Sequence, residues 1–140
     1  MNFDSDLVRK MNHKEFKKIA LVGATKNSTK YGNIILKDLI NKGFEVLPVN
    51  PNYDEIEGLK CYRSVKEIPK EVDVIVFVLP PKVGIQVAKE AVEAGFKKLW
   101  FQPGAESEEI REFLEKAGVE YSFGRCIMVE TGDRKMFLEV

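Results

Sequence analysis

Apolar positions gather in short runs along this chain, with polar segments between them. The runs lie at 19–22, 44–49, 72–79, 96–101 and 119–123, and each is long enough for a buried strand but too short for a helix. Between them, apolar residues recur at helical spacing on two stripes: Val83, Val87, Ala88, Ala91 and Val92, then Ile110, Phe113, Leu114 and Ala117. Strands that alternate with helices predict an α/β fold with a mainly parallel sheet.

Three glycines mark the places where predicted helices end and strands begin. Gly43, Gly95 and Gly118 each follow a helical segment and precede an apolar run, where a helix end favours a left-handed residue. The run at 72–79, VDVIVFVL, is the most apolar of all. It is therefore predicted to be the central strand, covered on both faces.

The remaining segments predict shorter elements. A charged helix over 4–16 has Leu7, Val8, Met11 and Phe16 on its apolar side, and the last helix begins near Ser107, a residue suited to the N-cap. A short strand is predicted within 59–63. We divide the chain into a charged N-terminal helix (1–16), a core domain (17–130) and a tail (131–140), which is interpreted as an extra strand or a subunit contact.

Composition and charge narrow the function classes. Acidic and basic residues balance at 22 each, so no footprint for nucleic acid or anionic membrane is expected. The apolar runs are far shorter than a bilayer span requires, and the charged N-terminus lacks the apolar centre of a signal peptide. Cys61 and Cys126 make neither a disulfide framework nor metal spacing. We expect a reduced, cytoplasmic, single-domain protein without a metal.

Gly23 ends the first predicted strand and opens a loop that resembles a phosphate-binding turn. A strand, a glycine turn and a helix N-terminus attract anions through free N–H groups and the helix dipole. In the G-x-G-x-x-G pattern, however, Thr25 and Ser28 replace the second and third glycines. Side chains of this loop, namely Thr25, Asn27, Ser28 and Lys30, are therefore predicted to contact phosphate. A solvated loop that binds nothing is an equal alternative.

Loops that follow the predicted strands meet at one edge of a parallel sheet, where ligands bind. They are 23–33, 49–53, 79–83 and 102–105. An NAD site would carry a carboxylate after the second strand, whereas this chain has Asn50 and Pro51. NADP or coenzyme A therefore fits better than NAD. None of the four loops shows a candidate catalytic acid or base, and His13 is interpreted as a surface residue.

Several short motifs in order resemble one known family. They are Gly23-Ala24-Thr25, Pro48-Val49-Asn50-Pro51, Gly58 with Cys61-Tyr62, Asp73, Pro80-Pro81, Trp100-Phe101-Gln102 and Arg125-Cys126. This set resembles the CoA-binding protein family, which is similar to the CoA-binding domain of the succinyl-CoA synthetase alpha subunit. The resemblance covers about 17–130. It implies a Rossmann-like α/β/α sandwich with a mainly parallel five-stranded sheet, and coenzyme A as the ligand.

The resemblance also implies which residues hold the ligand. They are Gly23, Ala24, Thr25, Asn27, Ser28, Lys30, Asn50, Pro51, Leu79, Pro80, Pro81, Val83, Gln102 and Gly104. His13 precedes the first strand and matches no phosphorylated histidine of the synthetase. We therefore expect a non-catalytic binder of coenzyme A or an acyl-CoA, which could act as a carrier, a sensor or a regulatory module. The alternatives are an NADP-dependent reductase with Tyr31 or Tyr53 as proton donor, and an interaction protein with a degenerate nucleotide site.

Three further expectations concern assembly and individual residues. Trp100, Phe101 and Tyr121, together with the apolar end of the tail, suggest a homodimer contact, although burial within the monomer explains them equally well. Gly23→Val is expected to block the ligand while the fold survives. Cys126 is considered as a site for a mixed disulfide with coenzyme A, against the stronger reading of a small buried residue.

Overall fold

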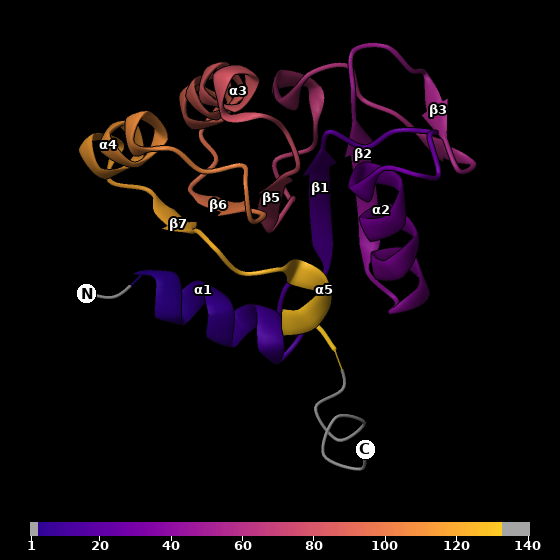
Figure 1. Ribbon diagram of the computed structural model, residues 1–140, viewed down its shortest axis with the longest axis horizontal. Coiled ribbons are helices and arrows are strands. Elements are labelled where there is room, and N and C mark those ends of the chain that lie inside the picture. The colour runs from indigo at the N-terminus through magenta and orange to yellow at the C-terminus, as the bar shows by residue number, and fades with distance from the viewer. Residues whose placement is uncertain (1–2, 133–140) are drawn as a thin grey trace.

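A five-stranded parallel sheet forms the centre of the computed structural model, which describes residues 3–132 (Figure 1). The strands are β1 (Lys18–Val22), β2 (Glu45–Val49), β5 (Val74–Phe77), β6 (Lys98–Phe101) and β7 (Glu120–Ser122). Their order is β2-β1-β5-β6-β7, and each neighbouring pair is parallel. The predicted α/β Rossmann-like fold and the central position of the 72–79 strand are confirmed.

Helices cover both faces of the sheet and give three layers. One face packs against α1 (Phe3–Asn12), α2 (Tyr31–Asn41) and the short α5 (Ile127–Glu130). The other packs against α3 (Pro81–Glu93), α4 (Glu108–Ala117) and the one-turn 3₁₀ helix η1 (Val65–Glu67). Figure 1 shows α3 and α4 on the opposite side of the sheet from α1 and α5. No helix within 3–132 combines the length and apolar character needed to cross a membrane.

Side-chain alternation along β1 explains how one strand serves two cores. Ile19 and Leu21 pack with α1 and α2, whereas Ala20 and Val22 pack with α3 and α4. All four are buried, as expected for a strand inside a parallel sheet. The apolar run that predicted this strand is therefore divided evenly between the two layers.

The local signals for helix ends are confirmed. The Ser107 hydroxyl accepts a hydrogen bond from the Ile110 N–H at 3.1 Å, which is the N-cap contact. Gly43, Gly95 and Gly118 all have positive φ. These glycines end α2, α3 and α4 and turn the chain into the next strand.

Several details differ from the sequence-based expectations. The first helix ends at Asn12, and Val83 and Ala117 are exposed rather than core residues. Residues near the expected 59–63 strand form an antiparallel hairpin of β3 (Glu55–Ile56) and β4 (Leu59–Lys60). The short helix α5 was not anticipated. The tail prediction for 131–140 falls almost wholly outside the described residues.

Trp100 and Phe101 are fully buried in the monomer. Trp100 packs in the layer with α1 and α2, and Phe101 stacks on Phe77 with ring centroids 4.3 Å apart. Tyr121 is half-buried and donates its hydroxyl to Glu115 at 2.8 Å. The interpretation of Trp100 and Phe101 as an exposed contact is wrong, because the monomer itself covers them. They therefore lend no support to the homodimer, which stays a prediction.

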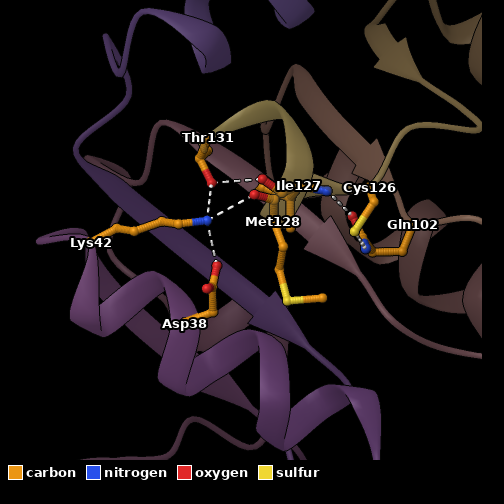
Figure 2. Close-up of polar contacts among 7 residues, drawn as sticks. All are labelled: Asp38, Lys42, Gln102, Cys126, Ile127, Met128 and Thr131. Carbon is orange, nitrogen blue, oxygen red and sulfur yellow. Dashed lines mark hydrogen bonds and ion pairs between the residues drawn. The ribbon is translucent and has the colours of Figure 1, made fainter. Parts of the chain in front are cut away.

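A polar clamp centred on Lys42 fixes α5 to the end of α2 (Figure 2). The Lys42 Nζ donates to Asp38 Oδ2 at 2.7 Å, to the Met128 carbonyl at 2.8 Å and to Thr131 Oγ1 at 3.1 Å. The Thr131 hydroxyl is fully buried and donates to the Ile127 carbonyl at 2.7 Å. One ammonium group thus satisfies three acceptors that join segments far apart in the chain.

Lys42→Met should lower the free energy of unfolding by about 2 kcal/mol, because it leaves a carboxylate and a carbonyl without their donor. Lys37→Met is the matched control, since Lys37 is about half exposed and its ion pair with Glu57 is 3.9 Å long. That control should cost less than about 0.5 kcal/mol. Urea denaturation of the two variants measures both values. Equal losses would mean that the clamp does not stabilise the fold.

Candidate functional site

Two adjoining hollows lie at the carboxyl ends of β1, β2 and β5. The first, here called the apolar hollow, has a volume of about 310 Å³, and most of its wall consists of the aliphatic side chains Val22, Val49, Val65, Leu79, Val83 and Val87. The second, the polar hollow, has a volume of about 630 Å³, and its lining includes the polar residues Thr25, Thr29, Lys30, Tyr31, Asn52 and Tyr53 beside Val78 and Leu79. Gly23, Asn50 and Leu79 line both. The hollows therefore meet at the end of β1.

Gly23 is needed here for the packing of the chain itself. Its φ is +98°, and a Cβ at this position would collide with the Val78 carbonyl at the end of β5. A Cβ at Gly32 would in turn collide with the Gly23 carbonyl. Gly32 thus allows the close approach of helix to strand that the third glycine of a dinucleotide turn usually provides. The premise that Gly23→Val leaves the fold intact is wrong, because this glycine packs against the backbone of the neighbouring strand end.

Internal hydrogen bonds shape the loop that follows. Asn27 Oδ1 accepts from the Thr29 N–H at 3.0 Å and from the Thr29 hydroxyl at 2.6 Å. Thr25 Oγ1 accepts from the Asn27 N–H at 3.2 Å and lies 3.2 Å from the Tyr53 hydroxyl. Side-chain contacts of this kind give a polar loop a fixed form. Thr25 therefore sits at the wall of the polar hollow in a set position.

Asn50 joins the loops that follow β1 and β2. Its Nδ2 donates to the Ala24 carbonyl at 2.8 Å, and its Oδ1 accepts from the Asn52 N–H at 2.8 Å. The buried Asn33 plays a similar part on α2, donating to the Thr25 carbonyl at 2.9 Å. These amides hold the rims of the hollows together. Ala24 itself is fully buried, and its carbonyl already accepts the hydrogen bond from Asn50.

Positive charge gathers around the polar hollow. Lys30 precedes α2, whose own first turn has no acidic residue. The Glu57 carboxylate accepts from Asn33 Nδ2 at 3.3 Å and offsets part of the positive end of the helix dipole. Lys26 lies over the Tyr53 ring with its Nζ 5.5 Å from the ring centroid. At the rim of the apolar hollow, Arg63 pairs with Asp54 at 2.6 Å, and the hydrogen bond to that carboxylate raises the pKa of Arg63. The site is thus suited to an anionic group on its polar side.

The structure brings together only part of the residue set expected from the sequence. Those that line a hollow are Gly23, Thr25, Lys30, Asn50, Pro51, Leu79 and Val83. Those that line neither are Ala24, Asn27, Ser28, Pro80, Pro81, Gln102 and Gly104. Pro80 and Pro81 instead begin α3, where a first-turn proline suits a helix.

Gln102 has a structural role behind the site. It is only 6% exposed, and its Oε1 accepts from the Trp100 indole N–H at 3.1 Å and from the Ile127 N–H at 2.7 Å. Its Nε2 donates to Cys126 Sγ at 3.4 Å (Figure 2). The carboxamide therefore joins β6 to α5.

Cys61 is buried, and burial raises the pKa of its thiol, which disfavours the reactive thiolate.

Sequence reasoning missed several residues of the two walls. They include Thr29, Arg63, Ser64, Val65, Val87 and Glu90. Tyr53, named from the sequence only as a proton donor of the reductase alternative, also lines the polar hollow. For Glu90 a signal existed, because positions 83, 87 and 90 share one helix face. Arg63 and Ser64 come from a segment whose path no periodicity predicts. Within 3–132, no three His, Cys, Asp or Glu residues gather into a possible metal site.

Comparisons with known proteins agree with the fold and identify related chains. A family described as CoA binding domain matches residues 17–132. Acetate–CoA ligase [ADP-forming] I of Archaeoglobus fulgidus is 34% identical over an alignment of 126 residues that covers 82% of this chain but only 18% of the ligase. Uncharacterized protein YneT of Bacillus subtilis is 31% identical over 113 residues, 81% of this chain and 84% of that protein.

Solved structures include proteins of similar size. A conserved hypothetical protein from Pyrococcus furiosus has 90% sequence identity and a TM-score of 0.82, covering 83% of this chain and all of that one. A hypothetical protein from Pyrococcus horikoshii OT3 has 36% identity and a TM-score of 0.82, covering 91% of this chain and 88% of the other. The same fold thus occurs both in small proteins and as a minor part of much longer ligases.

Proposed function

Because this chain belongs to the CoA-binding domain family, we propose that it binds coenzyme A or an acyl-CoA across the two hollows, as a non-catalytic carrier, sensor or regulatory module. The observation that carries the proposal is the meeting of an apolar and a polar, cationic hollow at the end of β1. Coenzyme A has the matching division, since an aromatic base and an amide-containing arm flank its charged phosphates. A ligand of this kind can place each part in the hollow that suits it.

The phosphates fit the polar hollow. Thr25, Thr29 and Lys30 line it beside the N-terminal residues of α2, Tyr31 and Gly32. A helix N-terminus with free N–H groups and a nearby cation binds phosphate without further devices. The adenine ring then falls in the apolar hollow, where aliphatic side chains can cover its faces. The volume of the apolar hollow, about 310 Å³, lies at the lower end of the range for ligand pockets.

The non-catalytic part of the proposal rests on the chemistry of the lining. Neither cysteine lines either hollow, and neither does His13, which follows the end of α1. The longer relatives named as ligases contain this fold as a small part of a larger chain. We infer that the domain supplies ligand binding, and that acyl transfer in such proteins requires the rest of the chain.

The identity of the ligand can be tested directly. Native purification followed by denaturation and mass spectrometry of the released small molecules should yield coenzyme A or an acyl-CoA. Titration calorimetry with coenzyme A and NADP then measures both affinities on the same protein. NADP as the released and tighter ligand would support a reductase instead, and binding of neither would support an interaction protein. Either result would overturn the proposal.

Lys30→Ala should weaken coenzyme A about three- to tenfold, because it removes one exposed cation from the phosphate side. Lys37→Ala serves as the control, since Lys37 lies within α2, the helix that Lys30 precedes, but lines neither hollow. Its affinity should match that of the unmodified protein. The effect of Lys30 should also shrink as salt is added, because exposed charges are screened. An unchanged affinity in Lys30→Ala would place the phosphates elsewhere.

A further inference from the structure

Glu90 is the one carboxylate in the wall of the otherwise largely aliphatic apolar hollow. It lies on α3 at three residues from Val87 and seven from Val83, so the three side chains share one face of the helix. The two valines line the hollow as well. The helix therefore presents two aliphatic groups and then a negative charge along the same wall.

Within residues 3–132, the Glu90 carboxylate has no ion pair or side-chain hydrogen bond. The nearest candidate in the lining, Arg63, is engaged elsewhere. Its Nη2 and Nε donate to Asp54 Oδ1 at 2.6 and 3.2 Å, and its Nη1 donates to the Pro51 carbonyl at 3.4 Å. Glu90 is half-buried, so water can reach its carboxylate while the hollow is open.

Closing the hollow with a ligand removes that water from the carboxylate. A carboxylate that loses water without gaining a donor carries a large penalty, so the ligand must offer an N–H or O–H group at this point. Phosphate groups are excluded, because they are anionic and offer only acceptors at neutral pH. The adenine ring fits both parts of the wall, since its faces are apolar and its exocyclic amine is a hydrogen-bond donor.

We propose that Glu90 selects the base of the ligand by accepting a hydrogen bond from the exocyclic amine of adenine; this inference rests on the proposed binding of coenzyme A. The same charge sets the direction of the ligand. Glu90 repels phosphates from the apolar hollow, while Lys30 and the start of α2 attract them into the polar hollow. Glu90 thus determines both which base the apolar hollow accepts and which end of the ligand occupies that hollow.

The test compares coenzyme A with an analogue in which hydrogen replaces the exocyclic amine, using titration calorimetry. The unmodified protein should bind the analogue roughly ten- to a hundredfold more weakly, because the carboxylate is then covered without a donor. In Glu90→Leu, which keeps a side chain of similar length and good helix propensity, this preference should fall below about twofold. Glu90→Gln keeps a neutral acceptor and should show an intermediate preference.

Glu93→Leu is the matched control, because Glu93 is exposed on the same helix and lines neither hollow. It should keep the full preference for coenzyme A over the analogue. Equal affinity of the unmodified protein for the two ligands would overturn the role of Glu90 and leave coenzyme A binding intact. A preference that survives in Glu90→Leu would do the same. Failure of coenzyme A itself to bind would instead refute the proposed function, so the two failures are distinguishable.

Discussion

Gly23→Ala should lower the free energy of unfolding by about 2–5 kcal/mol, and the upper end of that range equals the whole stability of a marginal domain. Two costs combine. An L-residue at the observed φ of +98° is strained by about 1–2 kcal/mol. The added methyl group also collides with the Val78 carbonyl, and relief of that collision must move the ends of two central strands, at about 1–3 kcal/mol.

Gly43→Ala separates these two costs. Gly43 has a φ of +94°, close to that of Gly23, but a Cβ there would meet nothing within 4 Å. Its replacement should therefore cost only the backbone strain, about 1–2 kcal/mol. Chemical denaturation of both variants gives the comparison. Similar losses at the two positions would show that the strand ends separate freely and that the close contact has little energetic weight.

Trp100→Ala should be similarly damaging, at about 3–5 kcal/mol. The indole ring is fully buried between the sheet and the α1–α2 layer, so its removal leaves a large cavity. Its Nε1–H donates to Gln102 Oε1 and to the Arg125 carbonyl, both at 3.1 Å. The substitution therefore removes packing together with the contacts that hold the segment before α5.

Two further variants separate the contribution of the ring from that of its N–H group and provide a control. Thermal and urea denaturation measure the stability of all three variants. Trp100→Phe keeps most of the ring and loses the N–H, so it should cost about half as much. Tyr31→Ala removes a ring that is 67% exposed and should change stability by less than about 0.5 kcal/mol. A mild loss in Trp100→Ala would contradict the view that this side chain belongs to the monomer core.

The parts of the fold that were predicted correctly depend on local rules. A run such as 72–79 can be stable only as a strand covered on both faces, so its central position follows from its residues alone. Gly43 and Gly118 lie where a helix must stop, and Ser107 lies where one must start, because backbone groups at helix ends need these residue types. Such signals act over a few residues and survive in any tertiary context.

The site was harder to predict because distant segments build its walls. Arg63 reaches the apolar hollow from the segment between β4 and η1, and Glu90 reaches it from the second half of α3. Polar residues such as Gln102 were misread for a related reason. A glutamine after a strand fits a ligand contact or a buried hydrogen-bond partner equally well, and only the Trp100 and Ile127 N–H groups decide between them.

The contact between Gly23 and Gly32 has a consequence for redesign of the protein. Because the two glycines fix where the chain leaves β1 and where it enters α2, the exposed residues 26–30 between them form an exchangeable insert. Libraries that vary these positions and keep both glycines should yield folded proteins with altered anion preference. Libraries that vary either glycine should yield mostly insoluble chains. The residues that can be changed to select a new ligand are therefore different from the residues that the fold requires.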